Sequence, residues 1–329
     1  MGSAPLNSRL QLLLSKQNPD GGWGHYAGQT SWLEPTIYGA FALWGEQRAA
    51  ADRALALVRR WQRPDGAFRP CLAIDEPHWA TSLALMAMQS EARGAGQSSP
   101  SKDEAQARAA MWLLGIKGAE GGWLNSLLKR FVTMPAEQNE ELHGWPWRPG
   151  TSSWIEPTAH ALVALKRAGV AAQGRIVMGE QMILERRCED LGWNYGNRRV
   201  YGVAVPSYPE TTALALLGLQ GRREAGASRE RARRFWNGGP RGMGRAWLGI
   251  AMQSHGWMPG VDFDEALPLG GDLTLTALEA VALQPAAVRR HFSISLTGSS
   301  TSSLTGSSTT SPAGSSTSWM TDSLAGGRP

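Results

Sequence analysis

The stretch QNPDGGWGHYAGQTSWLEPT, residues 17–36, recurs in outline as HGWPWRPGTSSWIEPT, residues 143–158. Both copies carry Gly-Trp near the start and Ser-Trp-x-Glu-Pro-Thr at the end, so Glu34 aligns with Glu156 at an offset of 122 residues. Gly21 and Gly22 permit a tight turn with positive φ, and a Pro beside an acidic residue suits the first turn of a helix. The doubled stretch therefore predicts a repeated unit in which a loop leads into a helix.

The same order of features recurs along most of the chain. A Gly-rich loop with an aromatic residue is followed by a Pro and an acidic residue, and then by a run rich in Ala and Leu. Five copies have this form, at residues 20–43, 65–88, 144–165, 191–219 and 255–283. A further loop start at 119–125 precedes an insertion that ends near residue 142. Internal repeats of this size indicate a repeat architecture.

Two kinds of helix alternate in this pattern. Runs such as TALALLGL are apolar on every side, which is typical of a buried helix, whereas DRALALVRRWQ has one charged face. We predict buried inner helices at 35–46, 77–90, 157–168, 209–220 and 273–284. We predict amphipathic outer helices at 6–17, 50–62, 102–117, 173–187 and 242–254, with a helix at 227–237 outside the alternation. An open solenoid would leave one side of the inner helices wet, so we expect an all-α, closed α/α-toroid of five to six helical hairpins.

The C-terminal part has a different composition. From residue 293 onward, three successive octads (LTGSSTSS, LTGSSTTS and PAGSSTSW) consist mainly of Ser, Thr and Gly. Such residues bury too little apolar area to offset the entropy of ordering. We therefore predict a toroid domain over 1–292 and a disordered tail over 293–329.

Composition limits the location and the partners of the protein. The formal net charge of +5 over 329 residues does not require a nucleic-acid partner. No run of about 18 apolar residues is present, so no membrane span is expected. The apolar run near the start is too short for the core of a signal peptide, which favours the cytoplasm. An Arg-rich segment at 222–234 is interpreted as a solvated helix, with attraction of a diphosphate or peripheral contact to an anionic membrane surface as the alternatives.

The loops resemble the Gln-Trp-type motifs of the terpenoid cyclase and protein prenyltransferase superfamily, which includes squalene and hopene cyclases. The resemblance covers about residues 8–285 and rests on QNPDGGWG (17–24), QRPDGAF (62–68), GAEGGW (118–123), LGWNYG (191–196) and SHGWMPG (254–260). It implies an α/α-toroid in which the loops clamp neighbouring hairpins together. The expected clamp residues are Trp23, Phe68, Trp123, Trp193 and Trp257, with Gln17 bonding a backbone group at a helix start.

The resemblance to hopene-type cyclases implies a catalytic acid, which that family carries in an Asp-x-Asp-Asp motif that leads into Thr-Ala at the start of an inner helix. DFDE, residues 262–265, has carboxylates at that spacing, but Glu265 replaces the last Asp and ALPLGGD intervenes before the helix. EPTA, residues 156–159, stands directly at a helix start, but Pro157 fills one acidic position. Crowded carboxylates raise one another's pKa and can hold a proton. The candidate proton donors are Glu34, Glu156, Asp262 and Asp264.

Acidic and aromatic residues near the inner-helix starts form a second group of candidates. In a closed ring, Glu34, Glu76, Glu156 and Glu210 would gather around one mouth of the toroid. Alternatively, each carboxylate only complements the dipole of its own helix. Aromatic faces beside a cavity can stabilise a carbocation or bind a cation. The candidate substrate-binding residues are Trp32, Trp154, Tyr26, Trp147, Glu76 and Glu210, with His25 beside them.

Three functions remain open from the sequence. The first is a squalene-cyclase-like protein that binds or cyclises an isoprenoid by proton-initiated isomerase or lyase chemistry. The second is a non-catalytic α/α-toroid that binds a lipid or a protein partner, and the third is a carbohydrate-active toroid with paired carboxylates. A prenyltransferase is disfavoured, because Cys71 and Cys188 lack the zinc-ligand pattern of that family and no DDxxD segment is present. No metal or cofactor is expected, and the oligomeric state is left open.

Overall fold

The computed structural model describes residues 3–95, 100–120, 138–169, 173–258, 260–264 and 271–294. The chain divides into two units, Met1–Ser295 and Leu296–Pro329. The expected disordered tail lies almost wholly outside the described residues, as do Trp123 and most of the insertion that ends near residue 142. The domain boundary at 292 therefore stays a prediction.

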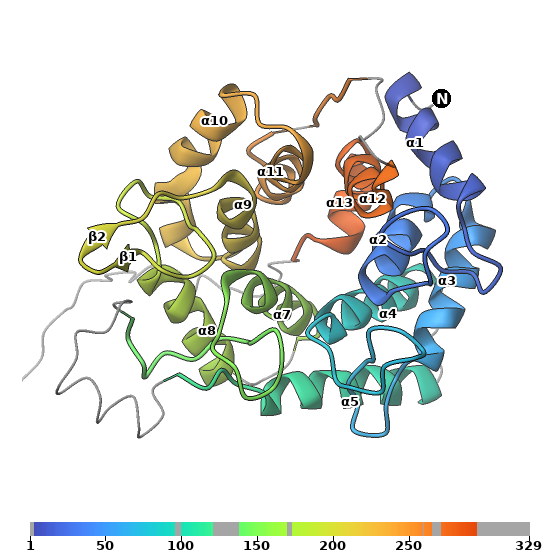
Figure 1. Ribbon diagram of the computed structural model, residues 1–329, viewed down its shortest axis with the longest axis horizontal. Helices are drawn as coiled ribbons and strands as arrows, with labels where there is room; N and C mark the ends of the chain where they lie inside the picture. Colours follow the sequence, from blue (N-terminus) through green and yellow to red (C-terminus); the bar gives the residue numbers. More distant parts are fainter. Residues whose placement is uncertain are drawn as a thin grey trace, which may run out of the picture. The chain divides into compact units, whose positions relative to one another are not determined.

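Helices of the first unit form a closed ring (Figure 1). Each inner helix packs on the next one along the chain, and the last packs on the first. The inner helices are α2 (Leu33–Leu43), α4 (Thr81–Ala95), α7 (Ile155–Arg167), α9 (Pro209–Gly218), α11 (Gly242–Ser254) and α12 (Leu273–Ala282). Nearly every described side chain of α2, α7 and α9 is buried, as expected for helices surrounded on all sides. The predicted all-α, α/α-toroid fold is confirmed.

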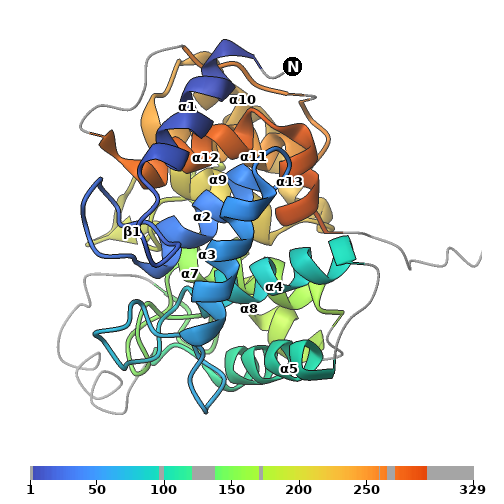
Figure 2. The same cartoon turned by 90° about the vertical axis from the view of Figure 1, so that its right-hand side faces the viewer.

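Other helices cover the outside of this ring (Figure 2). Helix α3 (Arg48–Arg60) shows the expected pattern, because its Ala and Leu face is buried against α2 while its Arg residues point away. The remaining outer helices are α1 (Ala4–Ser15), α5 (Pro100–Gly115), α8 (Gln173–Glu185) and α10 (Arg229–Asn237), with the 3₁₀ helix η1 (Arg223–Ser228) before α10. A small antiparallel hairpin, β1 (Arg199–Val200) and β2 (Val203–Ala204), lies in the loop before α9. Among the described residues, no helix is long and apolar enough to cross a membrane.

One helix takes a different place from the predicted one. Residues 242–254 were expected outside, but α11 packs between α9 and α12 as a member of the ring. Its Gly244 permits close packing on α9, since a Cβ there would stand 3.1 Å from Pro209 Cβ. Helix α10, expected outside the alternation, packs on α9 and α11 and is the charged outer neighbour of α11.

The loop clamp, meaning the buried aromatic residue of a repeated loop and its bonds to two helices, is complete in three loops. The Trp23 backbone N–H donates to Thr36 Oγ1 (3.1 Å) on the following inner helix, and its indole N–H donates to the Leu13 carbonyl (2.8 Å) on the preceding outer helix. Trp145 and Trp193 make the same pair of bonds. Buried tryptophan with a satisfied N–H gives a large packing contribution without a polar cost.

Three details of the clamp differ from expectation. Phe68 keeps the backbone bond, to Thr81 Oγ1 at 2.9 Å, but has no indole donor. Trp257 is only half-buried and stacks on His255 instead of joining two helices. Gln17 bonds a helix start, as expected, but the helix is an outer one: its amide donates to the Ala50 carbonyl (2.9 Å) in the first turn of α3.

Helix α13 (Pro285–His291) closes the end of the ring at which the inner helices finish. It packs on α2, α4, α11 and α12. The Arg167 guanidinium, at the end of α7, donates to the carbonyls of Arg290 (2.8 Å) and Ser293 (3.1 Å). The amide of Gln220, after α9, donates to the Phe292 carbonyl (2.9 Å). The opposite end of the ring, at which the inner helices begin, is called the mouth below.

Candidate active site

The mouth of the ring is built from the loops that precede the inner helices. Backbone bonds join neighbouring loops: the Leu33 N–H donates to the Pro70 carbonyl (2.8 Å), and the Leu273 N–H donates to the His25 carbonyl (2.8 Å). The repeated loop therefore serves two purposes. Its Gly-Trp part clamps helices, and its Trp-x-Glu-Pro part places an acidic residue in the first turn of an inner helix.

Glu34 lies in the first turn of α2 with its side chain only 12% exposed. Burial raises the pKa of its carboxyl to about 7, although its own backbone and the indoles of Trp79 and Trp32 oppose that effect. Its Oε2 is buried and has no hydrogen-bond partner among the described residues. His78 Nε2 stands 3.9 Å from Oε1, but burial lowers the pKa of His78 to about 4, so this ring is neutral at neutral pH. Glu34 therefore exchanges its proton near neutral pH.

Glu156 occupies the same position on α7. Burial, with smaller contributions from the charges of Glu210 and Glu34, raises the pKa of its carboxyl to about 8. Because each charge opposes the other, Glu34 and Glu156 act as a coupled unit, called the carboxyl pair below. At neutral pH the carboxyl pair holds more than one proton, which is the state required of a proton donor.

Aromatic side chains line the ring below the carboxyl pair. His160 Nδ1 donates to the Glu156 carbonyl (3.0 Å), which leaves Nε2 to accept from the Tyr38 hydroxyl (3.5 Å). Burial lowers the pKa of His160 to about 4 and raises that of Tyr38 well above its usual value, so both groups are neutral. The His160 ring lies 5.4 Å from the rings of both Trp79 and Trp247.

These four aromatic residues were not predicted as site residues from the sequence. Two of them could have been identified from the repeated sequence. Tyr38 and His160 follow Glu34 and Glu156 by four residues each, so they share the offset of 122 residues and point to the same side of their helices. Extending the alignment of the doubled stretch by one helical turn identifies them.

The aromatic residues that were predicted to bind substrate lie at the mouth. Trp32 and Trp147 are half-buried, and the Trp147 ring meets the ring of Trp79 edge to face at 4.9 Å. Trp154 is half-buried directly before α7, at the position equivalent to Trp32. The Tyr26 side chain is 46% exposed. Ligand contact by these residues stays a prediction.

The other two predicted rim carboxylates have different surroundings. Glu76 is exposed and forms an ion pair with Arg148, which is exposed as well. Glu210 accepts a hydrogen bond from the Tyr195 hydroxyl, and this bond is the main reason that the pKa of Tyr195 rises to about 12. Glu210 is thus close enough to influence Glu156, whereas Glu76 belongs to the outer edge of the mouth.

Asp262 and Asp264, the candidates from the cyclase-like DFDE segment, are exposed. Among the described residues, no hydrogen bond or ion pair joins either side chain to the carboxyl pair, and the Asp262 backbone carbonyl accepts from Arg245 (3.0 Å). Burial, which holds a proton on Glu34, is missing at these two positions. The catalytic role of Asp262 and Asp264 stays a prediction.

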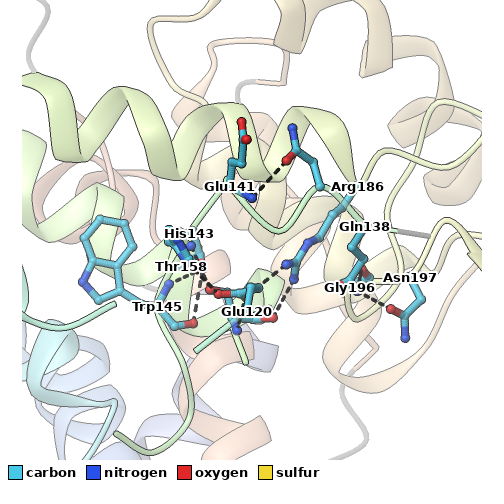
Figure 3. Close-up of polar contacts among 12 residues, drawn as sticks. Glu120, Gln138, Glu141, His143, Trp145, Thr158, Arg186, Gly196 and Asn197 are labelled. Carbon is cyan, nitrogen blue, oxygen red and sulfur yellow. Dashed lines mark hydrogen bonds and ion pairs between the residues drawn. The ribbon is translucent and has the colours of Figure 1, made fainter. Parts of the chain in front are cut away.

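A second polar cluster lies under the third loop (Figure 3). Glu120 Oε1 accepts from the Ser153 N–H (2.5 Å) and from Arg186 (3.1 Å), and its Oε2 faces His143 Nδ1 (3.1 Å). Burial raises the pKa of Glu120, but the bonds from Ser153 and His143 outweigh it, so the net direction is downward. Asp190 makes the equivalent bonds to its own loop through Ser207. The cluster therefore holds a loop in place through bonds to its backbone.

Comparison with known proteins finds similarity in the fold and in one segment of the sequence. No protein-family model matches the chain. Over 61 residues, or 18% of the chain, it is 48% identical to drimenyl diphosphate synthase from Streptantibioticus cattleyicolor, and this match spans only 12% of that synthase.

Solved structures resemble most of the chain. An α-amylase from Clostridium perfringens matches 88% of this chain and 97% of its own with a TM-score of 0.55 and 10% identity. The ent-copalyl diphosphate synthase from Streptomyces platensis matches 87% of this chain and 49% of its own, with a TM-score of 0.45 and 17% identity. At these identities the first likeness concerns the fold alone. The loop motifs resemble those of terpenoid cyclases, one 61-residue segment is similar to a diphosphate synthase, and the fold is a terpenoid cyclase-like α/α-toroid.

Proposed function

We propose that this protein binds an isoprenoid at the mouth of the toroid and that Glu34 protonates it to start cyclisation. The observation that carries the proposal is the Glu34 carboxyl, which is buried between Trp32 and Trp79, has a pKa near 7 and keeps Oε2 free of hydrogen bonds. A general acid works best when its pKa is close to the working pH, because the proton is then both present and transferable.

The reaction needs two things from the site. The Glu34 O–H bond breaks as a new C–H bond forms at one carbon of an alkene, which leaves a carboxylate and a carbocation on the neighbouring carbon. The faces of Trp79 and Trp32 then stabilise the cation, and the carboxylate is its counter-ion. Glu156, which has the higher pKa, remains protonated and so adds no second negative charge beside Glu34. Ring closure moves the cation along the chain, and a C–H bond beside it then breaks to form a new alkene, its proton passing to the Glu34 carboxylate directly or through water, which completes an isomerisation without a cofactor.

The choice of an isoprenoid rests on two supports. The first is the Gln-Trp-type loop pattern, which occurs in each repeat. The second is the segment that is 48% identical to a drimenyl diphosphate synthase, since that enzyme is named for a terpenoid product. The aromatic and largely uncharged surroundings of Glu34 favour an apolar chain over a sugar.

Turnover is the test. The protein is incubated with squalene and with shorter polyprenyl substrates, and cyclised products are sought by mass spectrometry. Because positioned acids contribute about 10²–10⁴-fold, Glu34→Gln should lower turnover by at least about 100-fold. Glu76→Gln is the matched control, because it makes the same change at the exposed edge of the mouth and should leave turnover within about twofold. Turnover unaffected by both Glu34→Gln and Glu156→Gln would show that the acid is assigned wrongly.

A non-catalytic binding module is the second candidate, and one observation favours it. Tyr38, His160 and Trp247 are almost fully buried and fill the middle of the ring, which limits the room for a folded substrate. This candidate predicts an isoprenoid that binds and is recovered unchanged, with no product at any substrate length.

A further inference from the structure

Three aromatic side chains meet on the axis of the ring. The inner helices follow one another in the order α2, α4, α7, α9, α11 and α12 (Figure 1). Tyr38 comes from α2, His160 from α7 and Trp247 from α11, so every second helix contributes one residue. The Tyr38 hydroxyl is 3.5 Å from His160 Nε2, and the Trp247 ring lies 5.8 Å from the Tyr38 ring and 5.4 Å from the His160 ring. Side chains of alternate helices touch one another only by crossing the axis.

This layer, called the floor below, leaves no space for solvent. Tyr38, His160 and Trp247 are 3%, 2% and 3% exposed. Under the floor, Phe292 packs on Trp247 with the ring centroids 5.7 Å apart, and it also packs on Phe41. Phe292 directly follows α13, the helix that closes the far end of the ring. Aromatic side chains therefore continue from the floor toward α13.

The floor lies a short way below the proposed acid. Glu34 and Tyr38 are four residues apart on α2, so they share one face and are separated by about 6 Å along the helix. A ligand that reaches Glu34 from the mouth meets the floor after about one helical turn.

We propose that the floor limits the length of the prenyl chain that the mouth accepts, and that Trp247 is the residue that sets this limit. The inference rests on the proposed function, because it assumes an isoprenoid at Glu34. Tyr38 and His160 bond each other, and His160 also bonds the Glu156 backbone, so their loss would disturb the carboxyl pair. Trp247 contacts both of them and Phe292 through its ring, so a smaller residue there opens space beneath the mouth and leaves those bonds in place.

The test compares ligand length with the size of residue 247. Dissociation constants are measured by calorimetry for geraniol, farnesol, geranylgeraniol and squalene. We expect the wild-type protein to bind the shorter alcohols and to bind geranylgeraniol and squalene more weakly. In Trp247→Ala, each buried methylene of a longer chain adds to affinity, so binding of geranylgeraniol relative to geraniol should rise by about tenfold or more.

Two further variants keep the outcome decisive. Trp247→Leu retains an apolar side chain, should fold if the alanine variant does not, and should shift the preference in the same direction. Trp61→Leu is the matched control, because Trp61 is as deeply buried but directly follows the outer helix α3, and its loss should leave the length preference unchanged.

The results separate the two claims. Equal binding of all lengths by the wild-type protein, or an unchanged preference in Trp247→Leu, overturns the floor and leaves the proposed function standing. No binding of any isoprenoid overturns both.

Discussion

The carboxyl pair should make the folded protein less stable as the pH rises above neutrality. In the folded state the pKa of Glu34 is raised from 4.5 to about 7 and that of Glu156 from 4.5 to about 8. Between the unfolded and folded values the native state binds more protons than the unfolded state, so the free energy of unfolding falls with increasing pH. The stability is complete below pH 4.5 and is lost as the pH passes through the folded pKa of each group.

Histidines partly offset this effect near neutral pH. His78 and His160 act in the opposite sense, because their folded pKa of about 4 lies under the usual 6.5, and their contribution to stability rises with pH until the unfolded state has lost its protons too, about one pH unit above 6.5. Between pH 6.5 and 8 the carboxyl pair still loses protons in the native state, whereas a variant without the pair keeps only the contribution of the histidines. At about 1.4 kcal/mol per pKa unit, the free energy of unfolding of the wild type should therefore fall by about 2 kcal/mol relative to such a variant across this window.

Urea denaturation of the wild-type protein and of the Glu34→Gln/Glu156→Gln double variant at several pH values measures the effect. Between pH 6.5 and 8 the free energy of unfolding of the double variant should rise by about 2 kcal/mol relative to that of the wild type. Glu76→Gln, an exposed replacement at the same mouth, should keep the wild-type slope. A double variant whose slope equals that of the wild type would refute the buried, protonated carboxyl pair.

Other substitutions test the loop clamp and the closure of the ring, each by urea denaturation at pH 7. Thr158→Val removes the acceptor of the buried Trp145 N–H (2.8 Å) and should cost about 1–3 kcal/mol, since the donor is left without a partner; no loss would mean that the clamp bond is dispensable. Arg9→Met breaks the buried bond to Glu279 (2.8 Å), which joins α1 to α12, and should cost about 3–5 kcal/mol. Arg148→Ala, which removes an exposed ion pair, should cost at most about 1 kcal/mol, and a larger loss would contradict its peripheral place.

Much of the fold follows from the repeated loops, and the exceptions have physical causes. Inner helices were recognisable because they are apolar on every side and follow a Pro beside an acidic residue. Helix α11 was misplaced because its preceding segment carries no such start, although its own Gly244, Trp247 and Gly249 fit a crowded position in the ring. Where the local pattern is weak, packing decides the position of a helix.

The candidate site was predictable only in part. Doubling of the loop singled out Glu34 and Glu156, which the structure places at one mouth, but sequence spacing could not distinguish them from Glu76. Burial distinguishes Glu34 and Glu156 from Glu76, and burial depends on which loops contact one another in the folded ring. Trp247 could not be found by alignment of the doubled stretch, since it comes from α11 and reaches the axis only when the ring closes.

Solvent deuterium offers the most direct test of proton-initiated chemistry at Glu34. The protein is incubated in D₂O with a polyprenyl substrate that it binds, and the product is weighed by mass spectrometry. We predict a cyclised product that carries one deuterium on carbon from the solvent, formed by the wild-type protein and by Glu76→Gln but lost in Glu34→Gln. A substrate recovered without cyclisation, or a cyclised product free of deuterium, would contradict the account.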